Sequence, residues 1–201
     1  MYQLKKAFAE HVEKNIIKYI VLLSLLLVGI LCGVIFSGNL SADMSVNLEK
    51  EIEPLIDELS KETTDSARIF YSAFLKNAKM FISVFVYGFF VWLIPLTFLN
   101  IFFWGFSAGF TVGYLCAAFG GAGMWIAVTS LLPSLLLKIP LCIFVSVVSI
   151  NNSIKRKSRY LVDGSNTKKY TLLFLVVYLF SHASVFVDAF VIPILITAGC
   201  S

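Results

Sequence analysis

Long apolar blocks alternate with shorter polar segments along the chain. The blocks lie at residues 19–37, 80–99, 101–119, 124–150 and 170–198. Each is close to the roughly 20 residues that a helix needs to cross a bilayer. We therefore predict an all-α integral membrane protein with about five transmembrane helices. Its second and third spans are expected to turn near Asn100 with almost no loop.

The first block is longer than the apolar core of about 7–15 residues that is usual in a secretory signal peptide. We expect it to remain as an uncleaved membrane anchor. A cleaved signal is the alternative, because the small residues Ser41 and Ala42 follow the block at a distance that suits a cleavage site.

Two polar segments have helical patterns of their own. Residues 1–18 carry apolar side chains at helical spacing among Lys and Glu, which predicts a cytoplasmic helix at the membrane surface or a solvated lead-in. Within the segment 38–79, residues 46–62 predict an amphipathic helix that Pro54 either begins or kinks. This helix packs either on its own bundle or on a partner protein. Its candidate partner-binding residues are Ile52, Leu55, Ile56 and Leu59.

Composition supports a membrane protein. The chain is 59% hydrophobic and 14% charged, with a mean hydropathy of +0.88. An ordinary soluble domain is roughly 45–50% apolar and about 25% charged. These values exclude an ordinary soluble domain and make the lipid bilayer the first expected partner.

The distribution of charge predicts the orientation. Ten of the sixteen basic residues lie in segment 1–18 and in the loop 151–169, which share a side if there are five spans. The positive-inside rule then places the N-terminus and this loop in the cytoplasm and the C-terminus outside. Segment 38–79 holds eight of the twelve acidic residues and faces outward. The net charge of +4 therefore reflects topology, and we expect no nucleic-acid partner.

A stripe of small residues marks the third block. Gly105, Gly109 and Gly113 recur every fourth residue, although a glycine costs a helix about 1 kcal/mol relative to alanine. In lipid, small residues let two helix backbones approach closely. The stripe predicts a helix-packing surface, directed at another helix of this chain or at a second copy in a homo-oligomer. Residues 120–123, with three further glycines, predict a turn.

Polar residues interrupt the fourth and fifth blocks. Lys138 and Asp188 lie in spans that are antiparallel neighbours, so they are expected either to pair or to line an ion or substrate path. His182 is a third intramembrane polar residue, on another side of the fifth span. Pro133 and Pro140 flank Lys138 and predict a kinked fourth span. Such discontinuities also line ligand sites in transporters.

Motifs of common enzymes do not occur. The chain contains no H-E-x-x-H, no G-x-S-x-G, no P-loop and no cluster of His or Cys in the sequence. We predict no catalytic residues, no cofactor and no metal site.

Several of these pieces together resemble the stage II sporulation protein M family. The stretches LKNAKMF, FFWGFSAGFTVGY and LPSLLLKIP occur in the family's order, with Phe74 and Asn77 ahead of the second span. The glycines of the stripe and the two prolines complete the resemblance.

The resemblance implies a function and a location. It implies a non-enzymatic scaffold in the mother-cell septal membrane of an endospore-forming bacterium, which recruits the peptidoglycan-degrading stage II sporulation proteins D and P for engulfment. A transporter or transporter subunit that uses Lys138 and Asp188 is the alternative.

Overall fold

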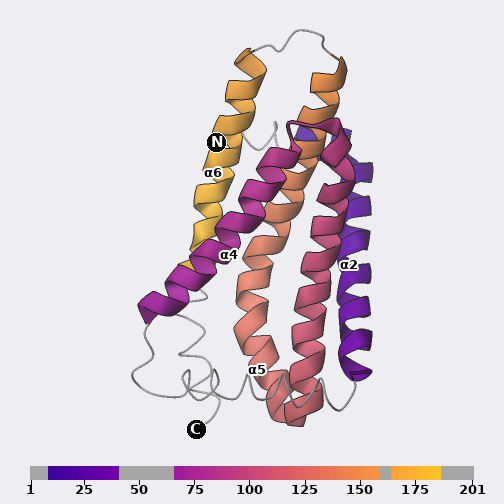
Figure 1. Ribbon diagram of the computed structural model, residues 1–201, viewed down its shortest axis with the longest axis vertical. Coiled ribbons are helices and arrows are strands. Elements are labelled where there is room, and N and C mark those ends of the chain that lie inside the picture. The colour runs from indigo at the N-terminus through magenta and orange to yellow at the C-terminus, as the bar shows by residue number, and fades with distance from the viewer. Residues whose placement is uncertain (1–8, 41–65, 159–163, 187–201) are drawn as a thin grey trace.

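The computed structural model describes residues 9–40, 66–158 and 164–186, and all regular structure in these ranges is helical. The prediction of an all-α protein is confirmed for this part of the chain. Residues 9–14 form a short helical segment. The longer elements are α2 (Ile16–Gly38), α4 (Ser66–Tyr87), the 3-10 helix η1 (Val91–Leu93), α5 (Ile94–Ser158) and α6 (Gly164–Phe186) (Figure 1). The predicted outer helix at 46–62 and the end of the fifth predicted span lie outside the described residues.

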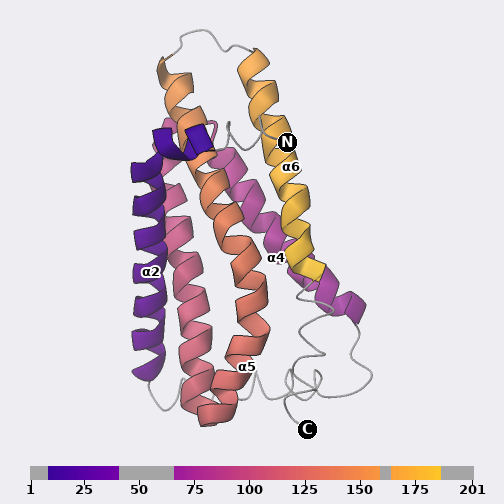
Figure 2. The same ribbon diagram turned by 180° about the vertical axis from the view of Figure 1, so that it is seen from behind.

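Helix α5 is a helical hairpin. Its backbone departs from helical dihedrals only at Gly120, where φ is 57° and ψ is −128°, a conformation that side chains with a Cβ rarely adopt. The chain reverses there, so residues 94–119 form a first limb and residues 121–158 an antiparallel second limb (Figures 1 and 2). This reversal lies in the glycine-rich segment where the sequence predicts a turn.

The turn between the second and third predicted spans lies earlier in the chain than Asn100. Helix α4 ends at Tyr87 and α5 begins at Ile94, so the chain turns through residues 88–93. Two residues favour this place. Pro95 lies in the first turn of α5, where a missing backbone N–H costs nothing. Gly88 lies beside the Tyr170 ring, and a Cβ on Gly88 would be 2.7 Å from the ring carbon Cζ.

The two prolines of the second limb do not break the helix. Pro133 and Pro140 both lie inside α5, and the backbone keeps helical dihedrals through both. A proline removes one hydrogen bond of the helix ladder, and membrane helices tolerate this where neighbouring groups or local adjustments satisfy the freed carbonyl. The prolines therefore do not interrupt the helix, and the predicted kink of the fourth span stays a prediction.

Three helices of the described chain are long and apolar enough to cross a membrane. They are Ile16–Gly38, Val91–Gly121 and Leu135–Arg156. They correspond to α2 and to parts of the two limbs of α5, the first of these together with η1. Helices of this length and hydropathy are typical of a membrane protein. Helix α4 and the described part of α6 are not among them, so five spans remain a prediction.

The described helices are arranged in two groups. Helix α2 stands beside the first limb of α5, and α4 runs obliquely toward α6 on the other side of the second limb (Figures 1 and 2). The start of α2, the turn at 88–93, the end of α5 and the start of α6 lie at one end of the bundle, the top of Figure 1. We call it the basic end, because Lys18, Lys155 and Arg156 lie there.

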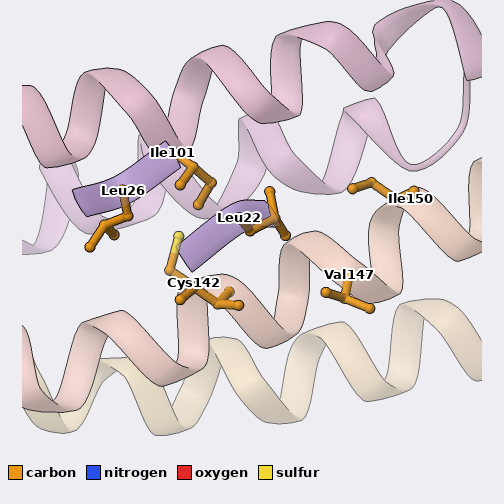
Figure 3. Packing of buried hydrophobic residues seen from close by; sticks show 7 residues of the cluster. Leu22, Leu26, Ile101, Cys142, Val147 and Ile150 are labelled. Carbon is orange, nitrogen blue, oxygen red and sulfur yellow. The ribbon is translucent and has the colours of Figure 1, made fainter. Parts of the chain in front are cut away.

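Two apolar clusters hold the helices together. One joins α2 to both limbs of α5, and Figure 3 labels its members Leu22, Leu26, Ile101, Cys142, Val147 and Ile150. The other joins α4, the second limb and α6 through Phe81, Val84, Val145, Tyr170, Phe174 and Val177. In lipid these contacts stabilise through van der Waals attraction, about 0.1–0.2 kcal/mol for each atom pair, rather than through removal of apolar surface from water.

Candidate functional site

The glycine stripe of α5 packs directly on α2 in the same chain. A Cβ on Gly105 would lie 3.2 Å from the carbonyl carbon of Leu26, and a Cβ on Gly113 would lie 3.1 Å from the Cα of Val34. These two neighbours are backbone atoms, which cannot rotate away as side chains do, although Gly113 also faces the side chain of Ser37. The contacts rise in residue number along both helices, so α2 and the first limb run parallel. Only residues without a Cβ permit so close an approach.

Helix α2 contributes glycines of its own to this interface. A Cβ on Gly29 would lie 3.0 Å from the Phe106 backbone nitrogen, and a Cβ on Gly33 would lie 2.6 Å from that of Phe110. Both glycines are buried, on the face of α2 that also carries Leu22 and Leu26. Neither glycine is among the residues predicted from the sequence, although their spacing of four residues is the same signal that marks the stripe in α5.

Aromatic rings flank the glycine contact. Phe102, Phe106, Phe110 and Tyr114 follow one another at four-residue spacing on the first limb, and successive rings are near parallel with centroids 6.3–6.5 Å apart. Phe36 of α2 leans on this ladder, 5.8 Å from the Phe106 ring. The rings therefore pack beside the glycines, where the two helices are in close contact.

Polar side chains of α5 and α6 cap the end of α4. Ser149 Oγ donates to the carbonyl oxygen of Val84 at 2.9 Å, and Tyr170 Oη donates to that of Phe85 at 3.0 Å. The last carbonyls of a helix have no partner within the helix. In an apolar environment an unpaired carbonyl is costly, so these donors stabilise the place where α4 ends.

Two further donors extend this cap to the turn. Ser153 Oγ donates to the carbonyl oxygen of Tyr87 at 2.9 Å, and Asn152 Nδ2 donates to that of Gly88 at 2.8 Å. Ser149 and Ser153 are fully buried. These residues are not among the site residues predicted from the sequence. Their signal is the run of polar residues after position 148 in a block that is otherwise apolar.

A second buried polar contact joins α4 to α6. Asn77 Nδ2 donates to Ser181 Oγ at 2.9 Å. His182 lies next to this pair, with its ring centroid 4.7 Å from that of Phe74 and its Nδ1 2.8 Å from the Tyr178 carbonyl oxygen. The other ring nitrogen, Nε2, is buried without a hydrogen-bond partner in the described part of the chain. His182 therefore belongs to the contact between α4 and α6.

The structure does not bring the other predicted site residues together within the described ranges. Lys138 is half-buried on the second limb of α5. Asp188 and the outer-helix residues Ile52, Leu55, Ile56 and Leu59 lie outside the described residues, so a Lys138–Asp188 pair remains a prediction. No group of three His, Cys, Asp or Glu side chains is placed to hold a metal ion in residues 9–40, 66–158 and 164–186.

Known proteins match this chain at the level of a family. A family model for stage II sporulation protein M matches residues 22–193. No curated protein and no solved structure matches the chain. The matched range contains the α2–α5 interface and the polar contacts described above.

Proposed function

Since the chain belongs to the stage II sporulation protein M family, we propose that it is a scaffold that anchors peptidoglycan-degrading proteins at the septal or engulfing membrane during endospore formation. Family membership and the three apolar helices make it a sporulation-related membrane protein. The further proposal names its partners as the stage II sporulation proteins D and P and assigns it no catalysis of its own.

The observation that carries the scaffold role is the backbone contact between α2 and α5. The glycines of both helices lack the side chains that normally separate two helices, and all five would meet backbone atoms if they gained a Cβ. A contact of this kind favours one fixed arrangement of the helices. A bundle with one fixed arrangement suits a scaffold, which holds other proteins in place. A transporter, in contrast, must alternate between two open states.

The proposed partner surface is the acidic amphipathic helix predicted at 46–62. It would face outward, on the side of the membrane where peptidoglycan lies, if the basic end faces the cytoplasm as the positive-inside rule indicates. Leu55 and Leu59 lie one helical turn apart on its apolar face. An exposed apolar face next to acidic residues is the kind of surface on which a partner protein docks.

The test is a comparison of two double variants in sporulating cells. Leu55→Asp with Leu59→Asp should release the cell-wall hydrolases, as measured by co-purification, while the protein stays in the membrane. Glu51→Gln with Glu58→Gln, on the charged side of the same helix, is the matched control and should retain them. Loss in both variants, or in neither, contradicts the proposed surface.

The transporter alternative predicts the opposite pattern. Replacing Lys138 by Met and Asp188 by Leu removes both intramembrane charges, and such a replacement of a buried pair is often neutral for stability. A scaffold so altered should accumulate, reach the septum and retain its hydrolases. A stable but inactive double variant would contradict the scaffold and favour transport.

A further inference from the structure

Four basic side chains lie at the basic end of the bundle. His11 comes from the helical segment 9–14, Lys18 from the first turn of α2, and Lys155 and Arg156 from the last turn of α5. The His11 ring lies 5.5 Å from the ring of Phe144 on the second limb. Three segments of the chain thus place basic residues at the same end of the bundle, and His11, Lys18 and Lys155 are close enough there to act on one another electrostatically.

Lys18 connects two of these segments directly. Its Nζ donates to the side-chain oxygen of Asn15 at 3.1 Å and to that of Asn151 on α5. Both acceptors are neutral amides. Lys18 is therefore held in position without losing its charge to a carboxylate.

The positive charges act on one another. Burial lowers the pKa of His11 below its ordinary value, and the nearby ammonium groups of Lys155 and Lys18 lower it further. None of the four basic side chains forms an ion pair with a described carboxylate. Glu10 and Glu13, the acidic residues in the described part of the chain, are exposed. Among the described residues, the charges of Lys18, Lys155 and Arg156 therefore have no carboxylate partner.

Two side-chain nitrogens of the cluster can donate to a further acceptor, the histidine nitrogen in the tautomer or cation that carries a proton there. Arg156 Nη1 and His11 Nε2 are buried and have no hydrogen-bond partner in the described chain. The guanidinium carbon of Arg156 lies 4.9 Å from the centroid of the Phe89 ring, which orients the guanidinium plane through a cation–π contact. Guanidinium and ammonium groups arranged together in this way match the oxygens of a phosphate.

Exposed apolar surface begins at the level of these charges along α2. Ile17 and Ile20, on either side of Lys18, are 75% and 58% exposed. A free phosphate has no use for apolar surface, whereas the acyl chains of a lipid do. The combination of phosphate-binding donors and exposed isoleucines at the end of an apolar helix fits a whole lipid.

We propose that His11, Lys18, Lys155 and Arg156 form a binding site for the phosphate headgroup of an anionic membrane lipid, with Ile17 and Ile20 against its acyl chains. A juxtamembrane cluster of basic residues attracts anionic lipids of the cytoplasmic leaflet. This site would fix the depth and tilt of α2 and α5 in the bilayer. It depends on insertion into a membrane and not on the scaffold role.

Phosphatidylglycerol is the probe for the test, and Trp92 is the reporter. Trp92 lies in η1, three residues after Phe89, and is 91% exposed. The full-length protein with Trp104→Phe and Trp125→Phe is placed in vesicles that contain brominated phosphatidylglycerol or brominated phosphatidylcholine at equal mole fraction. Preferential quenching of Trp92 by brominated phosphatidylglycerol, by about fivefold in relative affinity or more, is the expected result.

Matched variants separate a site from diffuse surface charge. Lys155→Gln with Arg156→Gln should abolish the preference. Lys168→Gln with Lys169→Gln removes the same charge from exposed positions near the start of α6 and should leave it intact. Equal loss in both double variants, or no preference in the unaltered protein, would overturn the proposal.

Two further experiments test whether the double variant is misfolded and whether the site binds a free anion instead of a lipid. Lys155→Gln alone changes an exposed side chain and should reduce the preference partway if the double variant loses its helicity. An unchanged preference in this single variant would then count against the site. Soluble glycerol phosphate should not abolish the preference, and if it does at a matched concentration, the site takes a free phosphate and the lipid proposal is wrong.

Discussion

Gly109 lies against the backbone of Ile30, such that a Cβ on Gly109 would be 2.7 Å from the Ile30 carbonyl carbon and 2.8 Å from its Cα. A single methyl group at this position must therefore push α2 and the first limb of α5 apart. Overpacking of this kind typically costs about 1–3 kcal/mol. We expect Gly109→Ala to lower the free energy of unfolding of the detergent-solubilised protein by that amount. The measurement is the melting temperature, which should fall.

Gly121→Ala is the control for this change. Gly121 is in the same helix, and nothing lies within 4 Å of the position of its Cβ. Its substitution should leave the melting temperature unchanged or raise it slightly, because alanine is the better helix former. Equal melting temperatures for the two variants would show that the glycine contact does not stabilise the bundle.

The hairpin of α5 depends on the backbone at Gly120. Space is open around this residue, but its φ of 57° is unfavourable for any residue with a Cβ. We expect Gly120→Ala to destabilise the protein by about 1–3 kcal/mol through backbone strain alone. Thermal unfolding followed by circular dichroism measures the effect, again against Gly121→Ala. A neutral Gly120→Ala variant would contradict the left-handed turn.

The cap on α4 can be tested with one hydroxyl group. Tyr170→Phe keeps the ring that stacks on Phe85, with centroids 5.3 Å apart, and removes only the donor to the Phe85 carbonyl. We expect a loss of about 1 kcal/mol in the free energy of unfolding. Tyr71→Phe removes a hydroxyl from a residue that is 64% exposed and should have no effect.

Stability should depend on pH through His11. Because the folded protein holds the pKa of His11 below its ordinary value of 6.5, the unfolded chain binds more protons there, and stability rises with pH. We expect the melting temperature to fall as the pH drops through about 6.5 toward the lower folded pKa. His11→Gln should flatten this dependence. Lys155→Gln should make the fall smaller and end it at a higher pH, since it removes one of the charges that lower the folded pKa of His11. A pH dependence unchanged in His11→Gln would contradict this assignment.

The predicted orientation can be tested by thiol labelling of intact cells. Five spans with a cytoplasmic N-terminus place Cys200 outside and Lys168 inside. With the other three cysteines replaced by alanine, a membrane-impermeant maleimide should label Cys200 without lysis. In a variant that carries Lys168→Cys in place of Cys200, labelling should require lysis. Labelling of both positions from outside would contradict the five-span arrangement.

Features that depend on local composition could be predicted from the sequence. Apolar blocks of membrane-spanning length predict helices because a chain in lipid must satisfy its backbone groups within each segment. The glycines at 120–123 mark the turn of α5 for the same local reason, since only a residue without a Cβ adopts the dihedrals found at Gly120. The stripe Gly105–Gly113 could be read as a contact surface, but its partner could not.

The tertiary structure alone decided which groups meet. Hydropathy does not distinguish the turn at Gly88 from the apolar residues around it. The position of this turn depends on contacts with Tyr170, Ser149 and Ser153, which lie in distant parts of the chain. The basic cluster is of the same kind, because Lys18 meets Asn151 across 133 positions. Contacts between residues so far apart depend on how the helices pack against one another, and a pattern read along one helix does not contain that information.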